Sequence, residues 1–517
     1  MTPTTTEAKR SMRAQAAEAA SMATTTHAGL PSAIATSVRW TLWLSLLALP
    51  FSYATNVLLA RIGPEALGTF GVLNVYIGVV FVFFFLGGCA VPMKFLPGMT
   101  TDRRSSFLAS YGFVILLSFL PWLLLATWRP QLLHFLFGNA GTPQLQLQLI
   151  YLSPLCLAYL LMITSLKGIL EMKWAQILDR GITFGLTLVL LLLLVCNPVW
   201  LKQHAANVVW LTYIGLTSLV AVAAFCRLIS VGALSGRPRF WLPPRFWPYT
   251  LLLQASGFLS VLGSRLDYIL ILNTGGLARL GDYVAITSIA GVIPRVAGFV
   301  VDSLLPALTN CLSAGNARAT TRVAEIHLRL IFPAVLGLCV ALSLFVRPVL
   351  AIMGPHYLQF AGLVQIACLG AAVQSFNGYN NTIFTATDHV RHGVIATLAR
   401  CIVFAGSFWP LWTHLQLAGA VISWTLAELA YHGVSLCLLR RNPAIKVPMA
   451  ATYLGCLAAL PLMPLLARFA LRGEYFIGAA LGSLALLVFF AVARYTVAEI
   501  RGFADLIMNA RTGSTLG

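Results

Sequence analysis

Long apolar stretches follow one another along almost the whole chain, and short polar gaps separate them. A helix of about 20 residues crosses a hydrocarbon core of about 30 Å and satisfies its own backbone hydrogen bonds there. The pattern therefore predicts an integral membrane protein with about 14 transmembrane helices. The predicted spans are residues 36–58, 68–93, 105–127, 146–167, 173–196, 206–229, 248–273, 281–312, 327–350, 360–385, 390–412, 416–439, 447–468 and 473–494.

The polar gaps differ in positive charge. When they are assigned alternately to the two sides of the membrane, most of the 34 lysines and arginines fall on the side that holds both termini. Cytoplasmic loops of membrane proteins carry this excess. We therefore expect a multi-pass protein of the bacterial inner membrane with both termini in the cytoplasm. The formal net charge of +19 then reflects topology and attraction to anionic lipid headgroups, and no nucleic-acid partner is expected.

The composition excludes a soluble globular protein of this length, because 59% of the residues are hydrophobic and only 9% are charged. The ten cysteines form no Cys-x-x-Cys pair, and all of them fall within or at the edge of a predicted span. We expect them to act as small apolar residues, with no disulfide framework, metal site or cofactor. The sequence contains no nucleotide-binding P-loop, so proton, sodium and membrane potential stay open as energy sources.

The chain carries a weak internal repeat. Gly68 follows the first predicted span as Gly281 follows the seventh, and Leu96-Pro97 has a counterpart in Leu305-Pro306 at nearly the same offset. An even number of spans separates these echoes, so the two halves have the same orientation, as in transporters with parallel repeats. The predicted fold is all-α, with two six-helix lobes related by this pseudo-repeat and two appended helices.

This organisation divides the chain into five segments. They are a flexible cytoplasmic tail (1–35), an N-terminal lobe (36–232), a basic, proline-rich cytoplasmic linker (233–247), a C-terminal lobe (248–441), and the two appended spans with a cytoplasmic tail (442–517). Two lobes joined on one side of the membrane can rock about a shared cavity near the middle of the bilayer. We therefore expect alternating access at the boundary between the lobes.

Several short motifs resemble one family of membrane carriers. The run Leu59–Gly68 leads into a span that closes with Gly87-Gly88-Cys89, Ser264–Asp267 precedes Gly275-Gly276, and Leu417–Trp424 precedes Glu428. These segments resemble the lipid-linked oligosaccharide flippases, the polysaccharide branch of the multidrug/oligosaccharidyl-lipid/polysaccharide exporter superfamily. The resemblance covers most of residues 36–441 and agrees with the predicted pattern of spans in two lobes.

The resemblance implies a cargo and partners. The cargo would be an oligosaccharide on a polyprenyl pyrophosphate, flipped from the cytoplasmic to the outer leaflet for the biosynthesis of a cell-surface polysaccharide or exopolysaccharide. The partners would be this lipid-linked oligosaccharide, membrane lipids, and the polysaccharide polymerase and export machinery. Phosphate charge must then pass through a region of low dielectric constant, which requires buried cations and hydrogen-bonding groups.

Arg295 is the first candidate for holding the phosphate. It lies near the middle of the span 281–312, directly after Pro294. A guanidinium can bind a phosphate with two hydrogen bonds, and the missing N–H of Pro294 can open the helix there. Asp302 falls on the same helical face, so an internal ion pair between Arg295 and Asp302 is the alternative.

The span 248–273 carries a second group. Asp267 shares one helical arc with several serines, whereas Arg265 points away from that arc. Small serines at this spacing favour a close helix–helix seam over a track for sugars. Arg265 could bind substrate or pair with a carboxylate from another span, and the sequence leaves both interpretations open.

The C-terminal lobe holds the remaining candidates. Gln374, Asn377 and Asn381 share one face of the span 360–385, where their amides could bind sugar hydroxyls or bond neighbouring helices. Arg400 and Glu428 lie near the middle of the next two spans. We expect them to form a buried ion pair, because an unpaired charge there would be costly.

The N-terminal lobe has little charge away from the span edges. Asp179 and Arg180 lie near the cytoplasmic end of the span 173–196, where we expect an interfacial pair. A multidrug or metabolite antiporter of the same superfamily would be expected to carry a buried carboxylate in this lobe, so this function is disfavoured. A lipid II flippase, which shares the plan of spans, is a further alternative.

A membrane-embedded glycan polymerase is the alternative from a different class. Such an enzyme needs an acid, a base or a metal site, commonly on a sizeable loop. No gap between the predicted spans is long enough for a folded domain, and the sequence has no Asp-x-Asp pair. We therefore expect a carrier without catalytic residues and not an enzyme.

Overall fold

The computed structural model describes residues 30–96, 99–128, 143–169, 171–244, 246–313, 317–387, 389–440, 477 and 480–484. Every regular element among these residues is helical, which confirms the all-α prediction. Nine helices of the described part are long and apolar enough to cross a membrane, and the shorter apolar helices Leu47–Ile62 and Leu152–Gly168 accompany them. The chain is therefore a multi-pass membrane protein.

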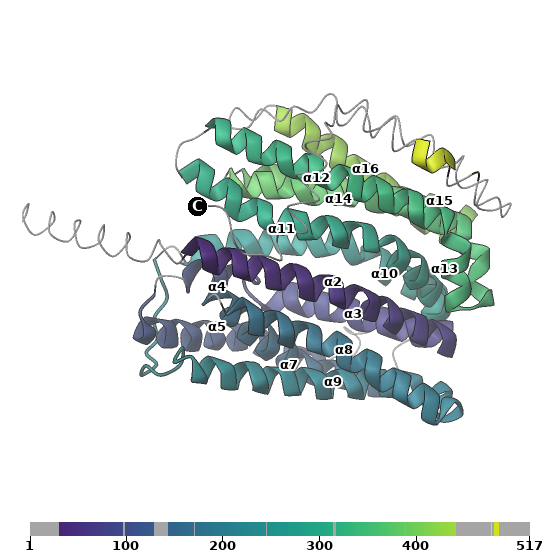
Figure 1. The fold of residues 1–517 in the computed structure, drawn as a ribbon. Helices are drawn as coiled ribbons and strands as arrows, with labels where there is room; N and C mark the ends of the chain where they lie inside the picture. Colours follow the sequence, from purple (N-terminus) through teal and green to yellow (C-terminus); the bar gives the residue numbers. More distant parts are fainter. Residues whose placement is uncertain are drawn as a thin grey trace, which may run out of the picture.

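The N-terminal half forms one group of packed helices, which we call the N-terminal bundle (Figure 1). Apolar side chains such as Leu188 and Leu192 remain exposed on its outside, as expected for helices that face lipid. The elements of this bundle are α2 (Leu30–Ile62), α3 (Pro64–Phe84), α4 (Ala90–Phe95), α5 (Thr101–Trp128), α7 (Pro143–Gly168), α8 (Met172–Cys196) and α9 (Pro198–Ser230).

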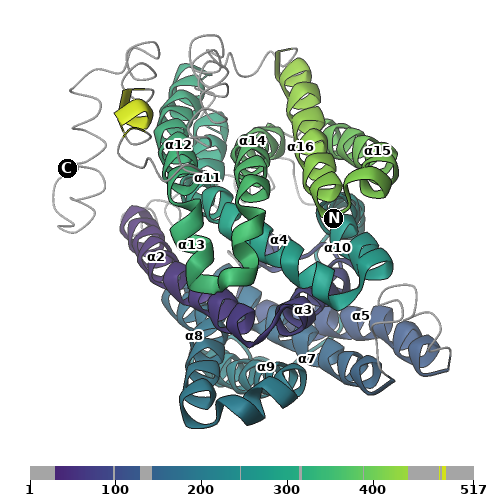
Figure 2. The same ribbon diagram turned by 90° about the vertical axis from the view of Figure 1, so that its right-hand side faces the viewer.

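The C-terminal half forms a second group, the C-terminal bundle, and Figure 2 shows the two bundles end-on with α10 between them. The elements of this bundle are α10 (Phe246–Ala290), α11 (Val292–Ser313), α12 (Ala317–Leu344), α13 (Val346–Met353), the short 3₁₀ helix η2 (Pro355–Phe360), α14 (Ala361–Ala386), α15 (Val390–Leu415) and α16 (Leu417–Arg440).

Each predicted span between residues 36 and 439 contains a described helix, but several boundaries differ. The predicted span 68–93 is interrupted after α3, where Gly87 and Gly88 adopt positive φ angles of 73° and 64°. Glycine adopts this left-handed conformation at little cost, and it ends a helix. Helix α2 begins at Leu30, upstream of the predicted start. The predicted spans 447–468 and 473–494 lie outside the described residues, apart from helical residues 477 and 480–484.

The predicted span 281–312 is also broken. Helix α10 is kinked at Gly276, which has a φ of 76°, and it continues to Ala290. The chain then leaves the helix at Gly291, and α11 begins at Val292. Pro294 lies in the first turn of α11, where its missing N–H needs no partner. The break expected at Pro294 therefore occurs three residues earlier, at the glycine.

The two bundles meet along α3 and α10, and the glycines of the sequence repeat lie at this contact. A Cβ on Gly281 would lie 1.8 Å from the carbonyl oxygen of Pro64 and 3.1 Å from the nitrogen of Gly68. A Cβ on Gly68 would lie 2.1 Å from the carbonyl oxygen of Leu277. Equivalent residues of two parallel repeats meet where they lie next to the axis that relates the repeats. The contact of Gly68 with Gly281 therefore supports the pseudo-repeat.

The linker between the bundles runs along α5. The hydroxyl of Ser106 accepts a hydrogen bond from the backbone nitrogen of Arg239 at 3.2 Å, and Ser110 accepts one from Trp241 at 2.7 Å. These bonds attach the extended linker to the N-terminal bundle.

Candidate functional site

A cavity with two branches extends from the boundary between the bundles into the C-terminal bundle. The N-branch has a volume of about 570 Å³ and is lined by α2, α3, α7, α8 and α9 on one side and by α10 and α11 on the other. The C-branch has a volume of about 500 Å³ and is lined by α10, α11, α14 and α16. The residues common to both branches are Arg265, Tyr268, Thr287, Arg295 and Gly298.

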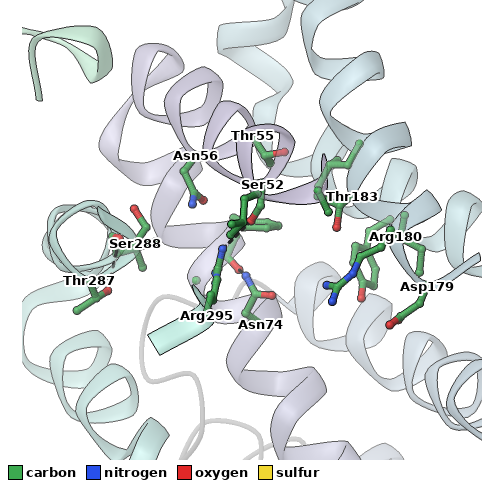
Figure 3. Close-up of a pocket in the computed structure, with 18 of the residues that line it drawn as sticks. Ser52, Thr55, Asn56, Asn74, Asp179, Arg180, Thr183, Thr287, Ser288 and Arg295 are labelled. Carbon is green, nitrogen blue, oxygen red and sulfur yellow. Dashed lines mark hydrogen bonds between the residues drawn. The ribbon is translucent and has the colours of Figure 1, made fainter. Parts of the chain in front are cut away.

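Arg295 stands where the two branches join. The break at Gly291 turns the first residues of α11 toward the cavity, and the Arg295 side chain is exposed there. Its Nη1 donates a hydrogen bond to Oγ of Ser52 on α2, at 2.9 Å (Figure 3). A neutral hydroxyl on the opposite bundle thus orients the guanidinium, and no carboxylate of the described residues forms an ion pair with it.

Two further arginines reach the same space. The Arg265 guanidinium lies 5.4 Å from the centre of the Tyr268 ring, and Arg180 enters the N-branch from α8 (Figure 3). Both are close enough for their charges to act on Arg295. Neither Arg265 nor Arg295 takes part in an ion pair among the described residues. The predicted pair of Arg295 with Asp302 is not placed, because the Asp302 side chain lies outside the described part.

Asp179 and Arg180, which the sequence predicted as an interfacial pair, both line the N-branch. Arg180 is eight residues into α8, which corresponds to about 12 Å along the helix axis. Asp179 forms an ion pair with Lys167, with Nζ and Oδ2 3.6 Å apart, and accepts a short hydrogen bond from the Tyr159 hydroxyl. The N-terminal bundle thus presents a carboxylate to the cavity, but Lys167 compensates its charge.

Asp267 lines the C-branch and is only 5% exposed. The Tyr283 hydroxyl donates a hydrogen bond to its Oδ2 at 2.6 Å, and the backbone nitrogen of Tyr268 donates one to Oδ1 at 2.9 Å. Two neutral donors therefore hold the carboxylate. This arrangement brings a negative group next to Arg265 without an ion pair between them.

Arg400 and Glu428 form the buried ion pair that the sequence predicted. Nη1 of Arg400 lies 3.1 Å from Oε1 of Glu428, and the two side chains are 9% and 0% exposed. Nδ2 of Asn377 donates to the other carboxylate oxygen at 2.7 Å, and Oδ1 of Asn377 lies 3.1 Å from Nδ1 of His432. Because no member of this network lines either branch, its geometry is that of a contact between helices.

The three amides of α14 are separated by the structure. Gln374 lines the C-branch, Asn377 belongs to the buried network, and Asn381 is exposed at the end of α14 near Gly393. The three amides that the sequence placed on one helical face therefore do not form one site. Trp424 is a cavity residue that the sequence did not suggest, because an isolated tryptophan in an apolar span carries no polar signal.

The N-branch offers further hydrogen-bonding groups. Asn56 and Asn74 line it together with Thr183 and Ser288 (Figure 3). Asn56 is 5% exposed, and its Oδ1 has no hydrogen-bond partner in the described part of the protein. A buried acceptor without a partner is costly, and a bound hydroxyl or amide group would satisfy it.

No protein-family model matches this chain, and no curated protein matches it in sequence. The fold is nevertheless similar to solved membrane transporters. The chain is 12% identical to the lipid II flippase MurJ in an inward closed conformation, with a TM-score of 0.65, over 87% of this chain and 98% of the flippase. It is 13% identical to an inward-facing multidrug resistance MATE transporter of the MOP superfamily, with a TM-score of 0.61, over 78% of this chain and 97% of the transporter.

A third similar structure is a MOP superfamily transporter from Pyrococcus furiosus, for which a reverse polarity of the binding pocket suggests a different function. It is 12% identical, with a TM-score of 0.54, over 79% of this chain and 94% of that protein. The three likenesses together show that this chain has the fold of MOP superfamily transporters. At these identities they show the fold alone.

Proposed function

We propose that this protein is a membrane carrier that flips a lipid-linked oligosaccharide, with the pyrophosphate headgroup bound in the central cavity. The observation that carries the proposal is the convergence of Arg180, Arg265 and Arg295 on one cavity. These arginines come from both bundles, and the ion pairs of the described residues include neither Arg265 nor Arg295. An anionic ligand would compensate the charge of Arg265 and Arg295.

The free-energy cost of placing several arginine side chains in the cavity supports an anionic cargo. Charged groups inside a membrane protein are expensive and mark transport pathways unless they are paired. The N-branch holds three guanidiniums and one carboxylate, Asp179, which is already paired with Lys167. A cationic drug would be repelled by this charge distribution, which disfavours a multidrug antiporter. The polarity of a binding pocket can differ within this fold, as the P. furiosus transporter suggests.

Lipid II is a second candidate cargo, because the fold is similar to that of a lipid II flippase. Lipid II carries the same kind of pyrophosphate, so the arginines alone do not discriminate between the two. The two cargoes differ in that lipid II carries a peptide and a polysaccharide precursor does not. The sequence motifs favour the polysaccharide precursor, and we keep it as the leading proposal. In this function the protein is a carrier in the inner membrane with both termini in the cytoplasm, and it catalyses no reaction.

Transport by the reconstituted protein tests the proposal. The protein is placed in liposomes with a fluorescent, short-chain polyprenyl pyrophosphate disaccharide, and the accessibility of the probe to a membrane-impermeant quencher is followed with time. We expect rapid equilibration between leaflets with the wild type and loss of at least tenfold in rate with Arg295→Ala, because a removed charge-assisted hydrogen bond costs about 1.5 to 3 kcal/mol.

A matched control separates the site from general loss of positive charge. Arg347 is exposed at the start of α13 and lines neither branch, so Arg347→Ala should flip the probe at the wild-type rate. An Arg295→Ala protein that inserts normally and keeps the wild-type rate would contradict the proposal. Faster flipping of lipid II than of the peptide-free probe would transfer the proposal to the second cargo.

A further inference from the structure

The two branches of the cavity differ in their chemistry. Both share Arg265 and Arg295. The N-branch adds Arg180 and Asp179, and Lys167 compensates the charge of Asp179, whereas the C-branch adds Asp267, which is held by neutral donors only. A phosphate is therefore attracted to the N-branch side of Arg295 by an additional cation. On the C-branch side it would approach the buried carboxylate of Asp267 and be repelled.

The C-branch carries an aromatic ring together with groups that a neutral, hydroxylated ligand needs. Its wall contains the indole of Trp424 and the amide of Gln374, and the Gln374 side chain makes no hydrogen bond to another described residue. An amide offers donors and an acceptor to hydroxyl groups, and the Asp267 carboxylate offers further acceptor positions. The face of an aromatic ring carries negative charge density, and the C–H groups on the face of a sugar ring can pack against it.

Trp424 is held in position by close packing. A Cβ on Gly370 of α14 would lie 2.7 Å from Cζ3 of the Trp424 ring, so only a glycine at that place lets the indole approach α14. Gly378, about one helical turn after Gln374 on α14, also lines this branch. The ring is therefore a fixed wall of the C-branch.

We propose that the C-branch is the saccharide subsite of the carrier, with Trp424 as the platform for a sugar ring and Gln374 as a partner of its hydroxyls, while the pyrophosphate lies between Arg180 and Arg295. This inference rests on the proposed function. It adds an orientation of the headgroup, with phosphate toward the N-terminal bundle and sugar toward the C-terminal bundle. It also makes Trp424 a residue that determines specificity for glycosylated over bare lipid pyrophosphates.

Two probes of equal charge test the subsite. One is farnesyl pyrophosphate esterified with a methyl group, and the other is farnesyl pyrophosphate that carries cellobiose, whose equatorial hydroxyls leave C–H groups on both ring faces. Dissociation constants are measured with the protein in lipid nanodiscs. We expect the wild type to bind the cellobiosyl probe more tightly. Trp424→Ala should weaken the cellobiosyl probe about tenfold and leave the methyl probe unchanged.

Matched variants separate the subsite from the fold and from the proposed function. Trp424→Phe retains an aromatic face and should restore most of the preference, and Trp409→Ala, at a lipid-facing tryptophan that is 52% exposed, should change neither constant. Arg295→Gln should weaken both probes alike. If the wild type binds both probes equally, or Trp424→Ala weakens both equally, the saccharide subsite is wrong. If neither probe binds to the wild type, the proposed function itself is wrong.

Discussion

Arg295 of the C-terminal bundle donates a hydrogen bond to Ser52 of the N-terminal bundle, with Nη1 and Oγ 2.9 Å apart. This bond crosses the cavity in which we place the headgroup. A hydroxyl partner orients the guanidinium without neutralising it. A phosphate would be the stronger partner, because donor and acceptor of the hydrogen bond would then both be charged. Ser52 therefore orients Arg295, and under the proposed function a phosphate takes the place of Ser52 as the partner of Arg295.

The Ser52–Arg295 bond leads to a first prediction. Ser52→Ala removes a partner that must be given up on binding, so the affinity for the methyl pyrophosphate probe should stay the same or increase. A net hydrogen bond contributes about 0.5 to 1.5 kcal/mol, which limits the increase to about tenfold. Titration of the nanodisc protein measures the effect, and Ser288→Ala, on the opposite wall of the N-branch, serves as the control. A loss of affinity in Ser52→Ala would mean that the hydroxyl contacts the ligand.

A second prediction concerns Arg180, which the proposed orientation places on the other side of the phosphate from Arg295. Arg180→Gln and Arg295→Gln should each weaken the methyl pyrophosphate probe. The double variant should lose less than the two single losses combined, because residues that share one ligand couple by about 0.5 to 3 kcal/mol. Lys173→Gln, at an exposed position near the start of α8, should have no effect. Strictly additive losses would show that the two arginines act on different ligands.

The sequence predicted most of the fold, because hydropathy alone reports which segments cross a bilayer. It also identified Gly68 and Gly281 as equivalent positions of the two repeats, but it did not predict that they are in contact. Contact between them depends on how two helices cross, which no local pattern encodes. The turn at Gly87 and Gly88 was missed because the surrounding residues are as apolar as a span, and glycines occur within transmembrane helices as well as at their ends.

The site was predicted in part. Arg265 and Arg295 were found because a charge in an apolar span is conspicuous, and the structure brings both to one cavity. Arg180 was predicted only as part of an interfacial pair, since the sequence gives its distance from a span edge but does not show the cavity that Arg180 lines. Among the polar residues of α14, sequence periodicity could not separate Gln374, which faces the C-branch, from Asn377, which faces α16.

A third prediction separates structural from transport roles in the buried network. Removing one member of the pair, in Arg400→Met or Glu428→Leu, leaves an uncompensated buried charge and should destabilise the protein by about 3 to 5 kcal/mol. The double variant should recover much of that loss, because no charge is then left alone. Unfolding in detergent measures stability, and the liposome assay measures flipping. A stable double variant that no longer flips the probe would give the pair a role in transport.

The last prediction uses the glycine contact between the bundles. A Cβ on Gly281 would lie 1.8 Å from the Pro64 carbonyl oxygen, so Gly281→Ala must separate α3 from α10 at the end that the predicted topology places outside. We expect the cavity to open there more often, which a membrane-impermeant thiol reagent applied from outside detects as faster labelling of Ser288→Cys in a cysteine-free background. Gly78→Ala is the control, because a Cβ at that position of α3 has nothing within 4 Å. Equal labelling in Gly281→Ala and Gly78→Ala, with both proteins monodisperse, would mean that this contact does not close the outer end of the cavity.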